Sequence, residues 1–108
     1  MKKQKPLQFH WAQEKAARNE EKYGVSFNEA ASIFKDRAAL YLDDVEHSQK
    51  EKREIVIGRS SNRRLLTCFF TRVDDVIHLI GARISTHRER QDYEDNSDDK
   101  TKILYKVK

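Results

Sequence analysis

The sequence predicts an α+β fold in which two N-terminal helices and a C-terminal helix pack on an antiparallel sheet of four to five strands. Apolar residues recur at helical spacing in the first third of the chain, and the period changes to two in short segments after Arg37. The last three of these segments are separated by hairpin-sized turns, which favours antiparallel pairing. A chain of 108 residues is expected to form one domain.

The two N-terminal helices are expected on either side of Gly24. Residues 11–23 are mostly good helix formers, and Gly24 stands where a left-handed residue can end a helix. Residues 26–29 (SFNE) match a capping box, so a second helix should start at Ser26, with Val25 and Ala30 as its hydrophobic staple. Its buried face should consist of residues at positions i, i+3, i+4 and i+7, namely Phe27, Ala30, Ala31 and Phe34.

Four strands and a third helix are expected after these two helices. The strand segments are rich in Ile, Leu, Val, Phe and Tyr, and polar turns separate them. Phe69 and Phe70 are interpreted as core residues. Residues 86–89 (THRE) form a second capping box, which predicts a helix that runs to about Asp95. The predicted strands are residues 38–45, 54–59, 65–71 and 76–83.

The end of the chain divides by charge. Residues 92–99 hold five acidic side chains and no base, and residues 100–108 hold four lysines and no acid. We therefore expect a single domain over residues 1–97, followed by a basic C-terminal tail over residues 98–108. Apolar residues alternate with lysines near the end of this tail, so a late edge strand over residues 103–107 is an alternative.

Composition excludes several classes of protein. The apolar runs are far shorter than the roughly 20 residues that cross a bilayer, and no apolar signal segment follows the basic start, so we expect a cytoplasmic protein. The single cysteine, Cys68, has no partner for an internal disulfide. No glycine-rich phosphate loop occurs, and no cofactor is expected. No metal site is expected either, because the four histidines lie in separate segments without ligand spacing: His10, His47, His78 and His87.

Positive charge gathers at two places in a chain whose 22 lysines and arginines exceed its 18 acids by four. Bases over a sheet can bind a nucleic-acid backbone, and a solvated basic face is the alternative. His87, in the first turn of the last helix beside Arg83, is a candidate proton acceptor. The first group lies on and around the second predicted strand and consists of Lys50, Lys52, Arg53, Arg59, Arg63 and Arg64. The second group lies where the last predicted strand passes into the last helix and consists of Arg83, His87, Arg88 and Arg90.

An ordered series of short motifs runs from residue 9 to residue 94. The motifs are FHW (9–11), KAARN (15–19), KYGVSFNEAA (22–31), HS (47–48), EKR (51–53), IGRSS (57–61), LL (65–66), AR (82–83) and RER (88–90), ending at Tyr93. In this order, and without a large gap, they resemble the BrnT toxins, which are small bacterial ribonucleases of type II toxin–antitoxin pairs. The resemblance covers most of the chain, and its specificity lies in the ordered set.

The resemblance implies a RelE-like fold, which agrees with the layout that the periodicity predicts. It also implies metal-independent RNA cleavage that blocks translation, carried by a BrnT-like toxin domain. A BrnA-like antitoxin would neutralise the toxin, and a heterotetramer of the two proteins is the expected assembly. Operator DNA would then be contacted only indirectly, through the antitoxin.

The resemblance also points to site residues. Lys22, Arg53 and Arg83 are the best candidates to stabilise charge on the phosphate, and Glu51 or His87 to transfer protons. For each arginine, a salt bridge to a nearby glutamate is the alternative interpretation. Further RNA contacts are expected from Arg59, Arg63, Arg64 and Arg88.

Three places depart from the family pattern. Ala12 stands where the family has an aspartate that caps the first helix, and Tyr23 stands where it favours a histidine. Residues 78–81 (HLIG) replace Arg-Ile-Ile-Ser, which removes an arginine and a hydroxyl beside the expected site. These changes keep a second hypothesis open: a non-catalytic interaction module that binds an antitoxin-like partner or nucleic acid through its basic face.

Overall fold

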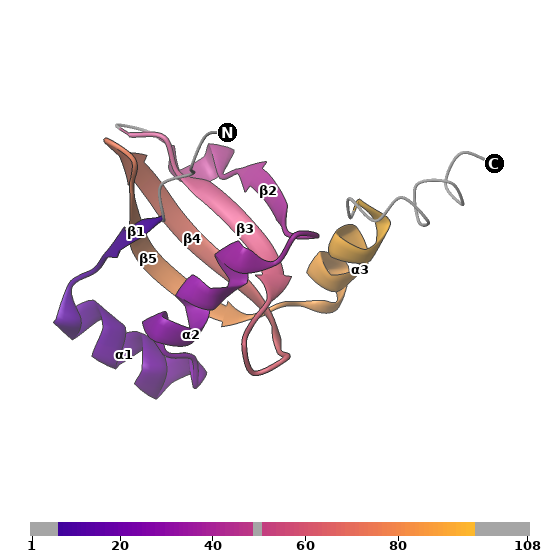
Figure 1. Cartoon of the computed structure of the whole chain (residues 1–108), viewed down its shortest axis with the longest axis horizontal. Coiled ribbons are helices and arrows are strands. Elements are labelled where there is room, and N and C mark those ends of the chain that lie inside the picture. The colour runs from indigo at the N-terminus through magenta and orange to yellow at the C-terminus, as the bar shows by residue number, and fades with distance from the viewer. Residues whose placement is uncertain (1–6, 49–50, 97–108) are drawn as a thin grey trace, which may run out of the picture.

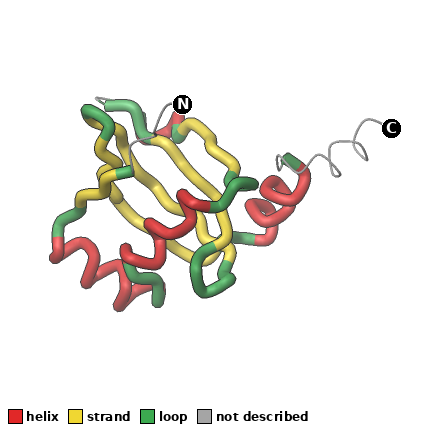
Figure 2. Tube along the Cα trace, viewed as in Figure 1, coloured by secondary structure: helices red, strands yellow, loops and turns green. Residues whose placement is uncertain are grey.

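The computed structural model describes residues 7–48 and 51–96, and its fold is α+β as the sequence predicts (Figure 1). The two N-terminal helices lie together on one side of a five-stranded sheet, and the third helix lies apart from them at one end (Figure 2). Short 3₁₀ turns at Ile33–Lys35 and Val45–His47 flank β2. In chain order the main elements are β1 (Gln8–His10), α1 (Gln13–Tyr23), α2 (Phe27–Ser32), β2 (Leu40–Asp43), β3 (Glu54–Arg59), β4 (Leu65–Val73), β5 (Val76–Ile84) and α3 (His87–Asp95).

The sheet has the strand order β1-β5-β4-β3-β2 and is mixed. Strands β2 to β5 form the predicted antiparallel meander, with Glu54 opposite Phe70 in the β3–β4 pair. The prediction lacked β1, which pairs in parallel with the start of β5 and places Phe9 opposite Ile77. A strand of three residues carries almost no periodicity, and its partner is distant in sequence, so local patterns could not reveal this pair.

The two faces of the sheet pack against different helices. Val56 and Leu66 belong to the main core with residues of α2, whereas Ile57 and Leu65, their neighbours in the strands, form a second cluster with Tyr93 of α3. Because side chains alternate across a strand, these two clusters lie on opposite faces. We call the second face, which also carries Ile55, Phe69 and Arg83, the open face. Helix α3 covers only one end of it, and Ile55 and Phe69 remain half-buried. The interpretation of Phe69 as a core residue was therefore wrong, whereas Phe70, on the other face, belongs to the core.

Local signals located several element ends correctly. Strand β3 spans the predicted residues, and α3 begins after Thr86 with both hydrogen bonds of the capping box present. Strands β4 and β5 extend two and one residues further than predicted. Strand β2 is shorter than predicted at both ends. The side chain of Asp36 accepts a hydrogen bond from the Ala38 amide and holds a turn before the strand, and the 3₁₀ turn at Val45–His47 follows it. The proposed strand at residues 103–107 lies outside the described residues.

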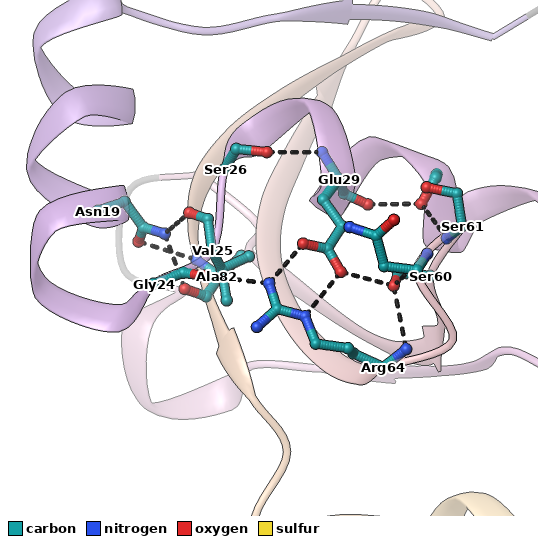
Figure 3. Close-up of polar contacts among 11 residues, drawn as sticks. Asn19, Gly24, Val25, Ser26, Glu29, Ser60, Ser61, Arg64 and Ala82 are labelled. Atoms are coloured by element: carbon teal, nitrogen blue, oxygen red, sulfur yellow. Dashed lines mark hydrogen bonds and ion pairs between the residues drawn. The ribbon is translucent and has the colours of Figure 1, made fainter.

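The two N-terminal helix starts agree with prediction only in part. Helix α1 begins at Gln13, and its N-cap residue Ala12 makes no side-chain cap, so the predicted inclusion of residues 11 and 12 was wrong. The Ser26 hydroxyl accepts the predicted hydrogen bond from the Glu29 amide at 3.0 Å. The carboxylate of Glu29, however, accepts from Ser60 and Arg64 of the β3–β4 turn (Figure 3). The reciprocal half of that capping box is replaced by a tertiary contact.

Candidate functional site

Arg83 lies on the open face near the end of β5 and is held by Glu89 of α3. The two side chains form a bidentate pair, with Nη1 to Oε1 at 2.8 Å and Nη2 to Oε2 at 2.9 Å. The Thr86 capping box places Glu89 in the first helical turn, and the Thr67 hydroxyl donates a further hydrogen bond to Oε1 at 2.9 Å. The guanidinium also lies over the ring of Phe69, 5.4 Å from its centre.

These contacts keep both partners charged. Burial opposes ionisation of Glu89, but hydrogen bonds from Arg83, Thr86 and Thr67 outweigh it and lower the pKa of this carboxyl to about 2. The hydrogen bond to Glu89, together with the negative charge of that carboxylate, raises the pKa of the Arg83 guanidinium against the effect of burial. Because 30% of the Arg83 side chain is exposed, this ion pair is in contact with solvent.

Helix α1 is attached to the edge of β5 by Asn19. The side-chain amide donates to the carbonyl oxygen of Ala82 at 2.8 Å and accepts from the Ala82 amide at 3.1 Å (Figure 3). It also donates to the carbonyl of Val25 at 2.9 Å. Asn19 therefore closes the part of the β5 edge that the short β1 leaves without a neighbouring strand. One helical turn further, the Lys22 ammonium lies 5.2 Å from the centre of the Tyr23 ring.

Arg64, predicted as an RNA contact, takes part in an internal ion pair. Its Nε donates to Glu29 at 2.9 Å and its Nη2 to the Gly24 carbonyl at 3.0 Å, with a second bond to the Glu29 carboxylate. The hydrogen bond from Arg64 is the main cause that lowers the pKa of Glu29, despite burial. The pair ties the β3–β4 turn to α2, so this guanidinium has a structural role whether or not it contacts RNA.

The other bases expected to contact RNA lie at the same end of the sheet as Arg83. The Arg59 guanidinium lies 5.9 Å from the centre of the Tyr93 ring. Arg63 is exposed in the β3–β4 turn with a φ of 65°. His87 and Arg88 are exposed in the first turn of α3, and Arg88 lies 4.0 Å from Asp92. These contacts leave much of the basic surface accessible.

Glu51 and Arg53 lie at the opposite end of the sheet. Arg83 of β5 pairs with Thr67 of β4, and Thr67 pairs with Ile57 of β3, so these three residues lie in one row across the sheet. Arg53 precedes Ile57 by four residues along the chain. Strand spacing and rise then place the Arg53 and Arg83 backbones roughly 16 Å apart. The structure thus separates the predicted site residues into two groups: Lys22, Arg83 and His87 at one end, and Glu51 and Arg53 at the other.

Sequence reasoning did not select a polar pair beside Arg53, because two aspartates next to His47 are as typical of a turn as of a site. In the 3₁₀ turn after β2, Nδ1 of His47 lies 3.0 and 2.9 Å from the two carboxylate oxygens of Asp44. The spacing Asp-x-x-His was visible in the sequence, but the burial of Asp44, which makes the pair unusual, was not. No cluster of three or more potential metal ligands occurs among residues 7–48 and 51–96. The expected absence of a metal remains a prediction.

A protein-family model described as the ribonuclease toxin BrnT of type II toxin–antitoxin systems matches residues 11–89. This chain belongs to the BrnT family. The match runs from α1 to the first turn of α3 and includes both groups of candidate residues. The family implies a ribonuclease toxin with an antitoxin partner. No curated protein matches the chain. In the described part of the chain, no helix is long and apolar enough to cross a membrane.

The departures from the BrnT pattern have different structural consequences. The ring of His78 in β5 lies against His10 of β1, with centres 5.2 Å apart. Gly81 has space for a side chain, since an added Cβ would meet the nearest atom, Oδ1 of Asn19, at an ordinary 3.6 Å. Tyr23 is exposed beside Lys22. All three residues are therefore compatible with the fold described above.

Proposed function

We propose that this BrnT protein is a metal-independent endoribonuclease that binds RNA along its open face and is neutralised by a BrnA-like antitoxin. The observation that carries the proposal is the placement of Arg83. Its guanidinium stands on the open face above Phe69, fixed by Glu89 and partly exposed. An arginine held in this way can meet a phosphate without first losing conformational freedom.

The separation of the two groups suggests how the RNA lies. Arg83 and Arg53 are too far apart to bind one phosphate, so they would contact different phosphates of a strand that crosses the sheet. Phe69 and Ile55, half-buried between them, offer an apolar surface for a base. Lys22 would add positive charge near Arg83.

The chemistry needs no metal. A base takes the proton of a ribose 2′-hydroxyl, the 2′-oxygen attacks the neighbouring phosphorus, and cations stabilise the charge that develops. Glu51 and His87 are the proton-transfer candidates from the sequence, one at each end of the sheet. Arg59, Arg63, Arg64 and Arg88 form the proposed RNA-binding surface around the Arg83 end.

The test is cleavage of RNA by the purified chain in the presence of EDTA. We expect activity in the wild type and a decrease of about 10²-fold in R53Q, because that substitution removes one phosphate contact. R18Q is the matched control, since Arg18 is exposed on α1. Equal rates in R53Q and R18Q would remove Arg53 from the site.

A non-catalytic interaction module is the second candidate function. It is favoured by the internal ion pair of Arg64 and by Tyr23 in place of a histidine. Tight binding of a BrnA-type antitoxin by a chain that leaves RNA intact would select this function.

We also infer the domain bounds, the assembly and the location of the toxin. The toxin domain would span residues 1–97, and the basic tail over 98–108 would add positive charge. Antitoxin and toxin would form a heterotetramer that contacts operator DNA through the antitoxin. An RNA substrate places the expected action in the cytoplasm.

A further inference from the structure

The pair of Asp44 and His47 has the geometry of an oriented acid–base group. The carboxylate of Asp44 is buried, with 8% of the side chain exposed, whereas 58% of the His47 side chain is exposed. A buried carboxylate normally has a strong donor as its partner. Here the donor is the imidazole, which lies 2.9 Å away. Asp44 stands at the N-cap position of the 3₁₀ turn, but its side chain makes no cap hydrogen bond to the backbone.

This contact determines which ring nitrogen can accept a proton. An ionised carboxylate can only accept hydrogen bonds, so the hydrogen on the neutral ring must be on Nδ1. Nε2 then carries the lone pair, and the ring is exposed to solvent. The orientation of His47 and the proton acceptor at its outer nitrogen are therefore fixed before any substrate arrives.

The dyad lies next to Arg53. The Asp44 amide donates to the Arg53 carbonyl at 2.9 Å, which continues the β2–β3 ladder beyond the pair of Asp43 and Glu54. Residues directly opposite each other in such a ladder point to the same side of the sheet. Ser48 strengthens the link, because its hydroxyl donates to the Asp44 carbonyl at 2.7 Å and accepts from the Arg53 amide at 2.8 Å.

The same ladder places this corner at the end of the open face. Leu42 pairs with Ile55, which is an open-face residue, and Asp44 and Arg53 are each two positions further along in the same alternation. Among the described residues, no hydrogen bond or ion pair engages the guanidinium of Arg53, in contrast to Arg83 and Arg64. A free cation and an oriented imidazole thus occur together.

We propose that His47 is the general base of the RNA cleavage reaction, that Asp44 is its positioning residue, and that Arg53 binds the phosphate that is cleaved. This assignment rests on the proposed ribonuclease function. Nε2 takes the proton of a ribose 2′-hydroxyl, and the 2′-oxygen forms a bond to the adjacent phosphorus. The bond from phosphorus to the 5′-oxygen breaks, and that oxygen takes a proton from water. The products are a 2′,3′-cyclic phosphate and a 5′-hydroxyl.

The two proton-transfer candidates from the sequence fit this role less well. Glu51 is exposed, and no described residue orients its carboxylate. His87 is also exposed without such a partner and lies at the Arg83 end. In this proposal, Arg83 holds a neighbouring part of the RNA, and the bond is broken at the Arg53 end.

The test compares H47N with the wild type and with H10N. An asparagine at position 47 can still donate a hydrogen bond to Asp44, so the turn is kept, but the acceptor that corresponds to Nε2 is lost. We expect cleavage by H47N to fall by about 10²–10⁴-fold. H10N, which changes an exposed histidine of β1, is expected to keep the wild-type rate. Thermal unfolding of each variant checks that the fold is intact.

A pH profile separates chemistry from structure. In the described part of the chain, the charged groups next to the dyad include Glu46 on its own turn, the Asp43–Lys52 pair at 3.5 Å, and Arg53. We expect the wild-type rate to rise with pH through one ionisation, and H47N to lack this step. D44N, which removes the carboxylate that holds Nδ1, should lower kcat more than it changes KM, because the orientation of the ring is lost while the groups that bind RNA remain.

The outcomes are distinct. Absence of cleavage by the wild type overturns the proposed function and the dyad assignment with it. Cleavage by H47N at the wild-type rate, or with an unchanged pH profile, overturns the assignment of His47 alone. Loss of the pH step with an intact fold supports it.

Discussion

The attachment of α1 to β5 depends on Asn19, and N19A should weaken the whole domain. The amide of Asn19 makes three hydrogen bonds, two to the backbone of Ala82 and one to the carbonyl of Val25. The side chain is almost fully buried, so no solvent replaces these partners easily. At about 1 kcal/mol for each bond, N19A should lower the free energy of unfolding by about 3 kcal/mol.

Urea denaturation, followed by circular dichroism, measures this loss. With a denaturant slope of about 1.5 kcal/mol per molar urea, the midpoint should fall by about 2 M. N28A is the matched control, because Asn28 is exposed on α2 and is expected to leave the midpoint unchanged within experimental error. A loss below about 1 kcal/mol in N19A would refute the argument that this side chain closes the edge of β5.

Two further predictions concern the ion pairs. The folded pKa of Glu89 is about 2, well below its ordinary value of 4.5, so its contribution to stability is fully present above pH 4.5 and is lost as the pH falls toward 2. At pH 7, E89Q should therefore have a lower free energy of unfolding than the wild type, by at most about 3 kcal/mol. Its melting temperature should also depend less on pH between pH 2 and 5, and an unchanged pH dependence would contradict this account. R64M should lower the free energy of unfolding by about 2–3 kcal/mol, because it leaves the buried carboxylate of Glu29 without its main partner. R63M, which changes the exposed neighbour, is the control, and equal melting temperatures for the two variants would show that the Arg64 pair adds no stability.

The local signals of the sequence were sufficient for most elements. Gly24 ends α1 with a φ of 70°, and Thr86 with Glu89 starts α3. Both features involve residues within one helical turn of each other, where spacing alone determines the contact. The ordered motifs also identified the family, because they are a property of the sequence and do not depend on where side chains lie in space.

The candidate site was less accessible from sequence. Charge alone could not show that Arg64 pairs with Glu29, or that Arg53 and Arg83 lie at opposite ends of the sheet. An arginine is held in an internal ion pair at one of these positions and has no such partner at another, because the residues that could pair with it come from elements distant in sequence. His47 shows the limit most clearly: its spacing from Asp44 is local, but the burial of Asp44 is not.

The sequence by itself determined the fold class, the helix boundaries set by caps, the antiparallel meander and membership of the BrnT family. Only the tertiary structure decided that β1 joins the sheet in parallel, that Glu29 accepts from the β3–β4 turn, and which arginines have no ion-pair partner among residues 7–48 and 51–96. The physical reason is the separation along the sequence over which each interaction acts. Caps and strand periods act over a few residues, whereas burial and ion pairing depend on chain segments that folding brings together.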